Sequence, residues 1–343
     1  SQYLTTVNEN RDFAWDPVSK NLVLPSVNNN LSVAILDGAS GAVLRTLNNT
    51  GVTGGTLARL GAAVGDDGRV FVSNLMSGSN NLSPFKIYGW TSVSDTNAPS
   101  VVFSQVNPQT VNGAFRFGDT LDVYGSGTNA RFAAAGSSSG TNQATGTNVR
   151  NNGNFMIGTL DGSNVNTIYS AIPGTATNLN DYSRGLTFVD ADTIIGNGSG
   201  SAKITDFVAA PTLSGTGATV TSAVAIGAGD RALGYTFLGG RSLLAALNFT
   251  NSMVSIYDIT DPAAAQLLVS NTTTSGTLTP NGNQNGGVEW GETIDSTSQV
   301  LYAMNANQGI QAMVFSIPEP SVTALGLTGL ACLGFSIWRR KRR

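Results

Sequence analysis

The sequence predicts an all-β body, a six-bladed β-propeller, followed by a single transmembrane helix at the C-terminus. Three observations favour this fold: only 11% of the residues are charged, a multi-strand pattern recurs along the chain, and residues 317–343 differ sharply from the rest. Soluble domains usually carry about 25% charged residues. Here Gly, Ser, Thr and Asn take their place, which is typical of short strands and turns rather than long solvated helices. A seven-bladed propeller and a large β-sandwich are the alternatives.

The recurring unit is an apolar strand, a turn rich in Asp and Gly, a second strand, a polar loop and then two further strands. Clear copies cover residues 13–47, 60–90 (continuing through the strand at 100–106), 232–270 and 288–317, and weaker ones cover 115–172 and 184–227. "NLVLPS" and "LSVAILD" in the first copy are rich in β-forming residues, and "DGASG" is a turn. The spacing is close to propeller-blade periods of about 40–50 residues with longer loops.

The two ends of the body favour a closed ring. Four antiparallel strands cannot bury both faces alone, whereas six such units packed around an axis can. The last copy stops after its third strand, and Tyr3–Val7 is a strand without partners of its own. We therefore expect Tyr3–Val7 to be the outer strand of the last blade, and residues 1–316 to form one propeller.

The composition excludes several kinds of chemistry. The chain has no histidine, so catalytic triads with a histidine base and zinc sites of the histidine type are excluded. Its single cysteine, Cys332, lies in the apolar tail, which leaves the body without disulfides. The body is acidic and its basic residues are scattered, which argues against nucleic-acid binding. No nucleotide-binding glycine motif occurs, and we expect no cofactor and no metal.

The C-terminal segment has the features of a membrane anchor. Ser321–Trp338 carries no charge and, as a helix, would span roughly 27 Å, slightly less than a hydrocarbon core of about 30 Å. Pro318 and Pro320 make a helix start near Ser321. Trp338 would lie at the interface, and the basic residues would lie on the cytoplasmic side, with the body outside the cytoplasm. These basic residues are Arg339, Arg340, Lys341, Arg342 and Arg343.

This tail resembles the PEP-CTERM sorting signal of exopolysaccharide-producing Gram-negative bacteria. The signal has three parts, and all three stand here in order: Pro318, Glu319 and Pro320, the apolar run Ser321–Trp338, and the basic end Arg339–Arg343. The resemblance implies export, temporary anchoring in the inner membrane, and processing near the motif by an exosortase. A plain tail anchor is the alternative. The resemblance covers only the tail and implies nothing about the activity of the body.

The body loosely resembles bacterial surface propellers of the YVTN or NHL kind, over about half of the chain. Fold resemblance does not imply an activity. An acid pair could still cleave glycosides, and the candidates near blade strands are Asp122, Asp190, Asp192, Glu289 and Glu292. Aromatic residues could stack on sugars, although packing between blades is their commoner role. The aromatic candidates are Trp15, Tyr88, Trp90, Tyr124, Phe132, Tyr235 and Trp290.

We expect an exported, non-catalytic structural or binding protein of the cell surface or extracellular matrix. Its partners would be an exosortase-type processing enzyme, the membrane through the tail, and exopolysaccharide or an envelope assembly. A carbohydrate-binding or glycoside-cleaving propeller is one alternative, and it requires acids and aromatic residues gathered on one face of the ring. A membrane-retained subunit of a larger assembly is the other.

Overall fold

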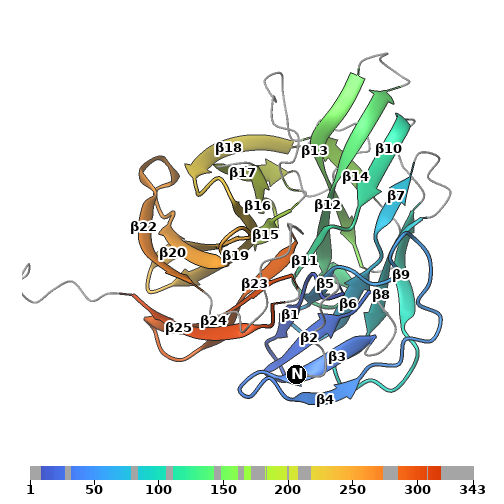
Figure 1. Cartoon of the computed structure of the whole chain (residues 1–343), viewed down its shortest axis with the longest axis horizontal. Coiled ribbons are helices and arrows are strands. Elements are labelled where there is room, and N and C mark those ends of the chain that lie inside the picture. Colours follow the sequence, from blue (N-terminus) through green and yellow to red (C-terminus); the bar gives the residue numbers. More distant parts are fainter. Residues whose placement is uncertain are drawn as a thin grey trace, which may run out of the picture.

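The computed structural model describes residues 9–317, except 28–31, 79–83, 106–110, 143–147, 161–165, 171–181, 183, 199–200, 208–217, 273–284 and 307. Viewed down the shortest axis, the strands form sheets arranged around a centre (Figure 1). The first two sheets have strand orders β1-β2-β3-β4 and β5-β6-β8-β9. Their strands are β1 (Ala14–Asp16), β2 (Asn21–Pro25), β3 (Val33–Asp37), β4 (Val43–Thr46), β5 (Ala62–Val64), β6 (Val70–Ser73), β8 (Phe85–Trp90) and β9 (Ser100–Gln105).

The third sheet is larger than the others. Its order is β14-β13-β12-β10-β7, and β11 also pairs with β12. The strands are β7 (Met76–Gly78), β10 (Val111–Phe117), β11 (Thr120–Tyr124), β12 (Arg131–Asn142), β13 (Asn148–Thr159) and β14 (Asn166–Ser170). Because β12 is long, its first half pairs with β11 and its second half with β10. The second half of β12 and the first half of β13 extend beyond the ring together with β10 (Figure 1).

The remaining sheets have orders β15-β16-β17-β18, β19-β20-β21-β22 and β23-β24-β25. Their strands are β15 (Leu186–Asp190), β16 (Thr193–Gly198), β17 (Ser201–Phe207), β18 (Ala218–Ala225), β19 (Asp230–Leu238), β20 (Arg241–Asn248), β21 (Met253–Asp258), β22 (Gln266–Thr272), β23 (Gly286–Thr293), β24 (Ser298–Asn305) and β25 (Gln311–Ser316). Two short 3-10 turns, η1 (Gly127–Asn129) and η2 (Pro262–Ala264), are the only helical elements of the described residues. None of the described segments is a helix long and apolar enough to span a bilayer.

The innermost strands close a ring. β1 contacts β5, β5 contacts β11, and the series continues through β15, β19 and β23 back to β1. β5 and β11, for example, run in the same direction, since Gly61 faces Leu121 while Gly65 faces Gly125 farther along both segments. The all-β propeller expected from the sequence is therefore confirmed, and each expected repeat supplies one sheet, apart from β7 in the second repeat, which joins the third sheet.

The expectation of six four-stranded blades is wrong for the described residues. Five sheets have four strands or more, and the last, β23–β25, has three. The expected completing strand, Tyr3–Val7, lies outside the described residues, as do the Pro-Glu-Pro motif, the apolar run and the basic end, residues 318–343.

The hydrophobic core lies in the seams between neighbouring sheets. One cluster joins β1–β4 to the next sheet through Val23, Ile35 and Trp90, and another closes the ring by packing Phe13 and Trp15 against Tyr302. Because both faces of a sheet are covered, central strands are apolar throughout, as in "LLAAL" of β20. Some seams are too close for a side chain: a Cβ on Gly185 would lie 1.8 Å from the Arg231 carbonyl oxygen.

Replacing Phe132 by Ala should strongly destabilise the protein. Phe132 is fully buried in the seam between the second and third sheets, and its ring packs edge-on against Phe103 with centroids 4.5 Å apart. The substitution should lower the free energy of unfolding by about 3–5 kcal/mol, measured by urea denaturation. The control is Phe237→Ala, because Phe237 is 65% exposed and its loss should change stability by less than about 0.5 kcal/mol. Equal effects of the two substitutions would contradict the seam as the core.

Candidate functional site

A polar pocket lies at the centre of the ring. Its volume is about 260 Å³, and it is lined by the inner-strand segments of all the sheets. Apolar side chains of the inner strands point into the seams, which leaves backbone and polar side chains to face the axis. Pockets for small-molecule ligands usually measure about 300–1,000 Å³, so this pocket suits a small ligand or one unit of a larger one.

Arg184 closes one end of the pocket. It precedes β15, and its Nη1 donates to the Asp119 carboxylate at 3.3 Å and to the Asn285 side-chain oxygen. Asp119 precedes β11 and Asn285 precedes β23, so one guanidinium joins three sheets across the ring axis. The Asp119 side chain is only 1% exposed, and this buried carboxylate keeps the guanidinium in place. The pocket therefore has a cationic floor at the start of the inner strands.

Two aspartates in the pocket wall connect neighbouring sheets. Asp12, just before β1, accepts hydrogen bonds from the backbone amides of Ala62 and Phe13, each at 3.0 Å. Asp122 on β11 accepts from the amides of Val123 and Phe188, each at 2.7 Å. In both cases one bond stays on the same chain segment and the other reaches the inner strand of the next sheet. These carboxylates therefore have a structural role, although they also line the pocket.

Glu289 on β23 is the third acid of the wall, and its carboxyl group has no hydrogen-bond partner among the described residues. It is partly exposed to the pocket. Burial raises its pKa well above the usual range, and the charges of Asp122 and Asp12 raise that pKa further. A glutamate in this position binds a proton readily and can donate it or accept one.

The two aspartates also hold protons more tightly than usual. Burial raises the pKa of Asp122 to about 6, although its amide hydrogen bonds act in the opposite direction. Burial also raises the pKa of Asp12 well above the usual range, with a contribution from the charge of Asp122. Asp12, Asp122 and Glu289, which we name the acid trio, therefore influence one another electrostatically across the ring.

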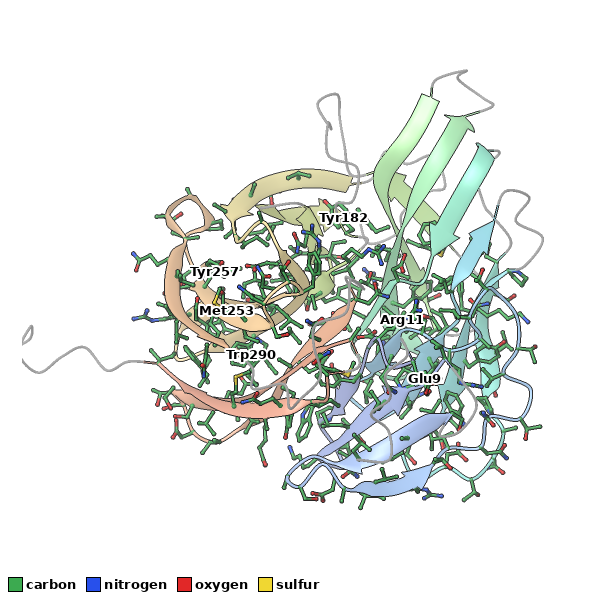
Figure 2. The ribbon with its side chains drawn as sticks, in the orientation of Figure 1. Glu9, Arg11, Tyr182, Met253, Tyr257 and Trp290 are labelled. Carbon is green, nitrogen blue, oxygen red and sulfur yellow. The ribbon has the colours of Figure 1, made fainter. Side chains whose placement is uncertain are left out.

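The mouth of the pocket lies at the C-terminal ends of the inner strands and has an aromatic rim. Trp15, Tyr124, Tyr235 and Trp290 all line it. The indoles serve mainly in packing: Trp15 stacks on Tyr302 with centroids 5.1 Å apart, and Trp290 (Figure 2) donates from Nε1 to the Gly234 carbonyl at 3.1 Å. Tyr124 is 38% exposed, and Tyr235 is partly exposed. The tyrosines are therefore the rim residues free to contact a ligand.

The remaining residues singled out from the sequence lie away from the pocket. Tyr88, Trp90 and Phe132 are buried in the seams. Asp190 accepts from the Asp192 amide within a turn, and Asp192 pairs with Arg131 at 3.0 Å. Glu292 is exposed and lies 3.8 Å from Lys20. Asp122 and Glu289 are thus the acid candidates that the fold brings to the pocket.

Sequence reasoning missed Asp12 and Arg184. A signal was present for the arginine, because Arg11 (Figure 2), Arg59 and Arg184 each stand shortly before an inner strand, and Arg231 is the second residue of another. Arg59 donates from Nε to the Ser26 carbonyl of the preceding sheet at 2.9 Å, so this position links sheets more than once. No comparable pattern marks Asp12, whose role depends on the amide of a distant residue.

A metal site is not formed by the acids. In the part of the chain that the structure describes, no three acidic, histidine or cysteine side chains lie together as metal ligands would. The three acids of the trio therefore line a pocket and do not converge on one position where a metal ion could bind.

Comparison with known proteins gives the fold. No protein-family model and no curated protein sequence matches the chain. A DUF4623 family protein from Bacteroides eggerthii is similar in structure, with a TM-score of 0.62, 17% identity, and coverage of 92% of this chain and 72% of that chain. The major Malassezia sympodialis allergen Mala s 1 has a TM-score of 0.52, 12% identity, and coverage of 91% and 92%. A glucose dehydrogenase has a TM-score of 0.50, 12% identity, and coverage of 90% and 97%.

Replacing Glu289 by Gln should flatten the dependence of stability on pH. Because the folded-state pKa values of Glu289 and Asp122 are raised, the folded protein holds more protons than the unfolded chain. Their stability contribution is complete below the unfolded pKa values, about 4, and is lost as pH rises through the folded ones, about 6 for Asp122. Urea midpoints should therefore fall less between about pH 5 and 8 in Glu289→Gln than in the wild type.

The control for this measurement is Glu292→Gln, three residues farther along the chain. The Glu292 side chain is 56% exposed, so its removal should leave the slope unchanged. Equal slopes for the wild type and Glu289→Gln would contradict a proton held at Glu289.

Proposed function

We propose that the chain is an exported, non-catalytic, six-bladed propeller, with β23–β25 as the sixth blade, that binds a polyhydroxylated ligand in its central pocket. The observation that carries the binding role is the pocket closed by Arg184 and walled by the acid trio. The tail supports export. Because it resembles a sorting signal of exopolysaccharide-producing bacteria, we propose exopolysaccharide at the cell surface or in the matrix as the ligand class.

The chemistry of the pocket favours sugar hydroxyls. Each hydroxyl can donate one hydrogen bond and accept others. Asp122, ionised above its pKa of about 6, accepts. Burial raises the pKa values of Asp12 and Glu289, whose carboxyl groups donate when protonated and also accept, and a guanidinium donates. The partly exposed rings of Tyr124 and Tyr235 at the mouth offer apolar faces for the carbon-bound hydrogens of a sugar.

A glycoside-cleaving propeller is the second candidate, favoured by the pKa values of Asp122 and Glu289. Glycosidases use one protonated acid and one ionised carboxylate on either side of the scissile bond. A raised pKa at Glu289 suits the acid, and Asp122, with a pKa of about 6, is ionised at neutral pH. We favour binding because both oxygens of Asp122 accept backbone amides, one of them from the next sheet, which gives this carboxylate a structural role.

Glu289→Ala should weaken the binding of oligosaccharides prepared from the exopolysaccharide of the producing cells. Losing hydrogen bonds to a buried acid costs about 1.5–3 kcal/mol, so the dissociation constant measured by calorimetry should rise about 10- to 100-fold. Glu292→Ala is the matched control and should bind as the wild type does. Equal affinities for Glu289→Ala and the wild type would contradict the pocket as the binding site. If new reducing ends form while the protein is incubated with the oligosaccharides, the glycoside-cleaving function would be supported in place of simple binding.

The intact mass of the protein purified from its own cells should correspond to a chain that ends near Pro320. The resemblance of residues 317–343 to a sorting signal implies cleavage there, after which the propeller works in the matrix. A mass that corresponds to the chain up to Arg343 would show that the apolar run is a permanent anchor, and the protein would then be a membrane-retained subunit.

A further inference from the structure

Two large apolar side chains are exposed on the side of the ring where the pocket opens. Phe237, near the end of β19, is 65% exposed, and Ile294, just after β23, is 54% exposed. Both follow rim residues of the pocket, Tyr235 and Trp290, on the same inner strands. We name Phe237 and Ile294 the apolar rim. Exposed apolar side chains that cluster at one edge often mark a contact surface.

The last described residue lies between the turns that carry these side chains. The Ile317 amide donates to the Thr297 carbonyl at 2.8 Å, in the turn after Ile294. Its Cδ1 atom lies 2.6 Å from the position that a Cβ on Gly239 would take, in the turn after Phe237. The chain therefore leaves the propeller beside the apolar rim.

The sequence that follows sets how far a membrane can lie from this point. Only Pro318, Glu319 and Pro320 separate Ile317 from the uncharged run that begins at Ser321. Four chain steps reach about 14 Å at full extension. A bilayer that holds Ser321–Trp338 must therefore start within that distance of Ile317, next to Phe237 and Ile294.

We infer that the apolar rim rests on the lipid surface while the tail is attached, which turns the mouth of the central pocket towards the membrane. The inference rests on the anchoring role proposed for the tail. The tether keeps the rim at high local concentration near the lipid, so two apolar side chains suffice where a free protein would need more. Cleavage near Pro320 would release the rim and open the pocket to the matrix.

Charge on this edge indicates zwitterionic rather than anionic lipid. Asp295 lies next to Ile294, and hydrogen bonds from Thr297 lower its pKa, so it stays ionised. Glu292 is nearby and is paired with Lys20. An acidic edge would be repelled by an anionic surface, whereas phosphatidylcholine attracts the apolar groups without that cost.

The test uses the full chain reconstituted in phosphatidylcholine vesicles that contain a lipid-borne quencher. In a Cys332→Ser background, an environment-sensitive dye is placed at Ser296→Cys, which is exposed in the turn after Ile294. The control dye is placed at Thr250→Cys, exposed between β20 and β21 of the neighbouring sheet, in a loop at the opposite end of the strands. The dye at position 296 should be quenched several-fold more than the dye at 250.

A second pair of variants separates the apolar contact from the tether. Phe237→Ser with Ile294→Ser should bring quenching at position 296 close to that at 250, whereas Val101→Ser, 50% exposed on β9, should leave it unchanged. Equal quenching at positions 296 and 250 in chains that float with vesicles would overturn the inference and leave the anchor standing. Chains that fail to float with vesicles would overturn both.

Discussion

Closure of the ring is the constraint on which the rest of the structure depends. Each sheet has two apolar faces, and only a neighbour on each side can cover them. The final seam, where Phe13 and Trp15 meet Tyr302 and Met304, joins the start of the chain to its last sheet. Because closure brings all inner strands together in parallel, it also creates an axial space that no apolar side chain fills. The pocket is therefore a consequence of how the seams are packed.

The same few groups stabilise the ring and give the pocket its chemistry. Asp12 and Asp122 connect neighbouring sheets through backbone amides, and Arg184 joins three sheets at the floor. Burying these carboxyl groups is costly, which is why their pKa values rise. A site whose groups are fixed by structural bonds is pre-organised for a ligand. Glu289, which lacks such bonds among the described residues, is the member of the acid trio best able to respond when a ligand enters.

Local sequence patterns predicted a large part of the fold. Turns such as the one at Asp37, whose carboxylate accepts from the Ser40 amide at 2.7 Å, depend on residues that are close along the chain. Runs such as "LLAAL" in β20 reflect burial on both faces, which is also visible locally. The third sheet was harder to predict, because β12 pairs with both β10 and β11, and no local sequence pattern indicates which strands pair. Of the acid candidates, the sequence singled out Asp122 and Glu289 but equally Asp190, Asp192 and Glu292, which lie outside the pocket.

The sequence by itself determined the repeat, the β-rich composition, the absence of histidine chemistry and the character of the tail, because each depends only on composition or on residues close together along the chain. Only the tertiary structure decided which acids meet. Asp12, Asp122 and Glu289 come from the first, third and last sheets, and their raised pKa values exist only because folding buries them around one pocket. It also decided that the chain leaves the ring beside Phe237 and Ile294, since that position depends on how the last strand packs against two turns distant in sequence.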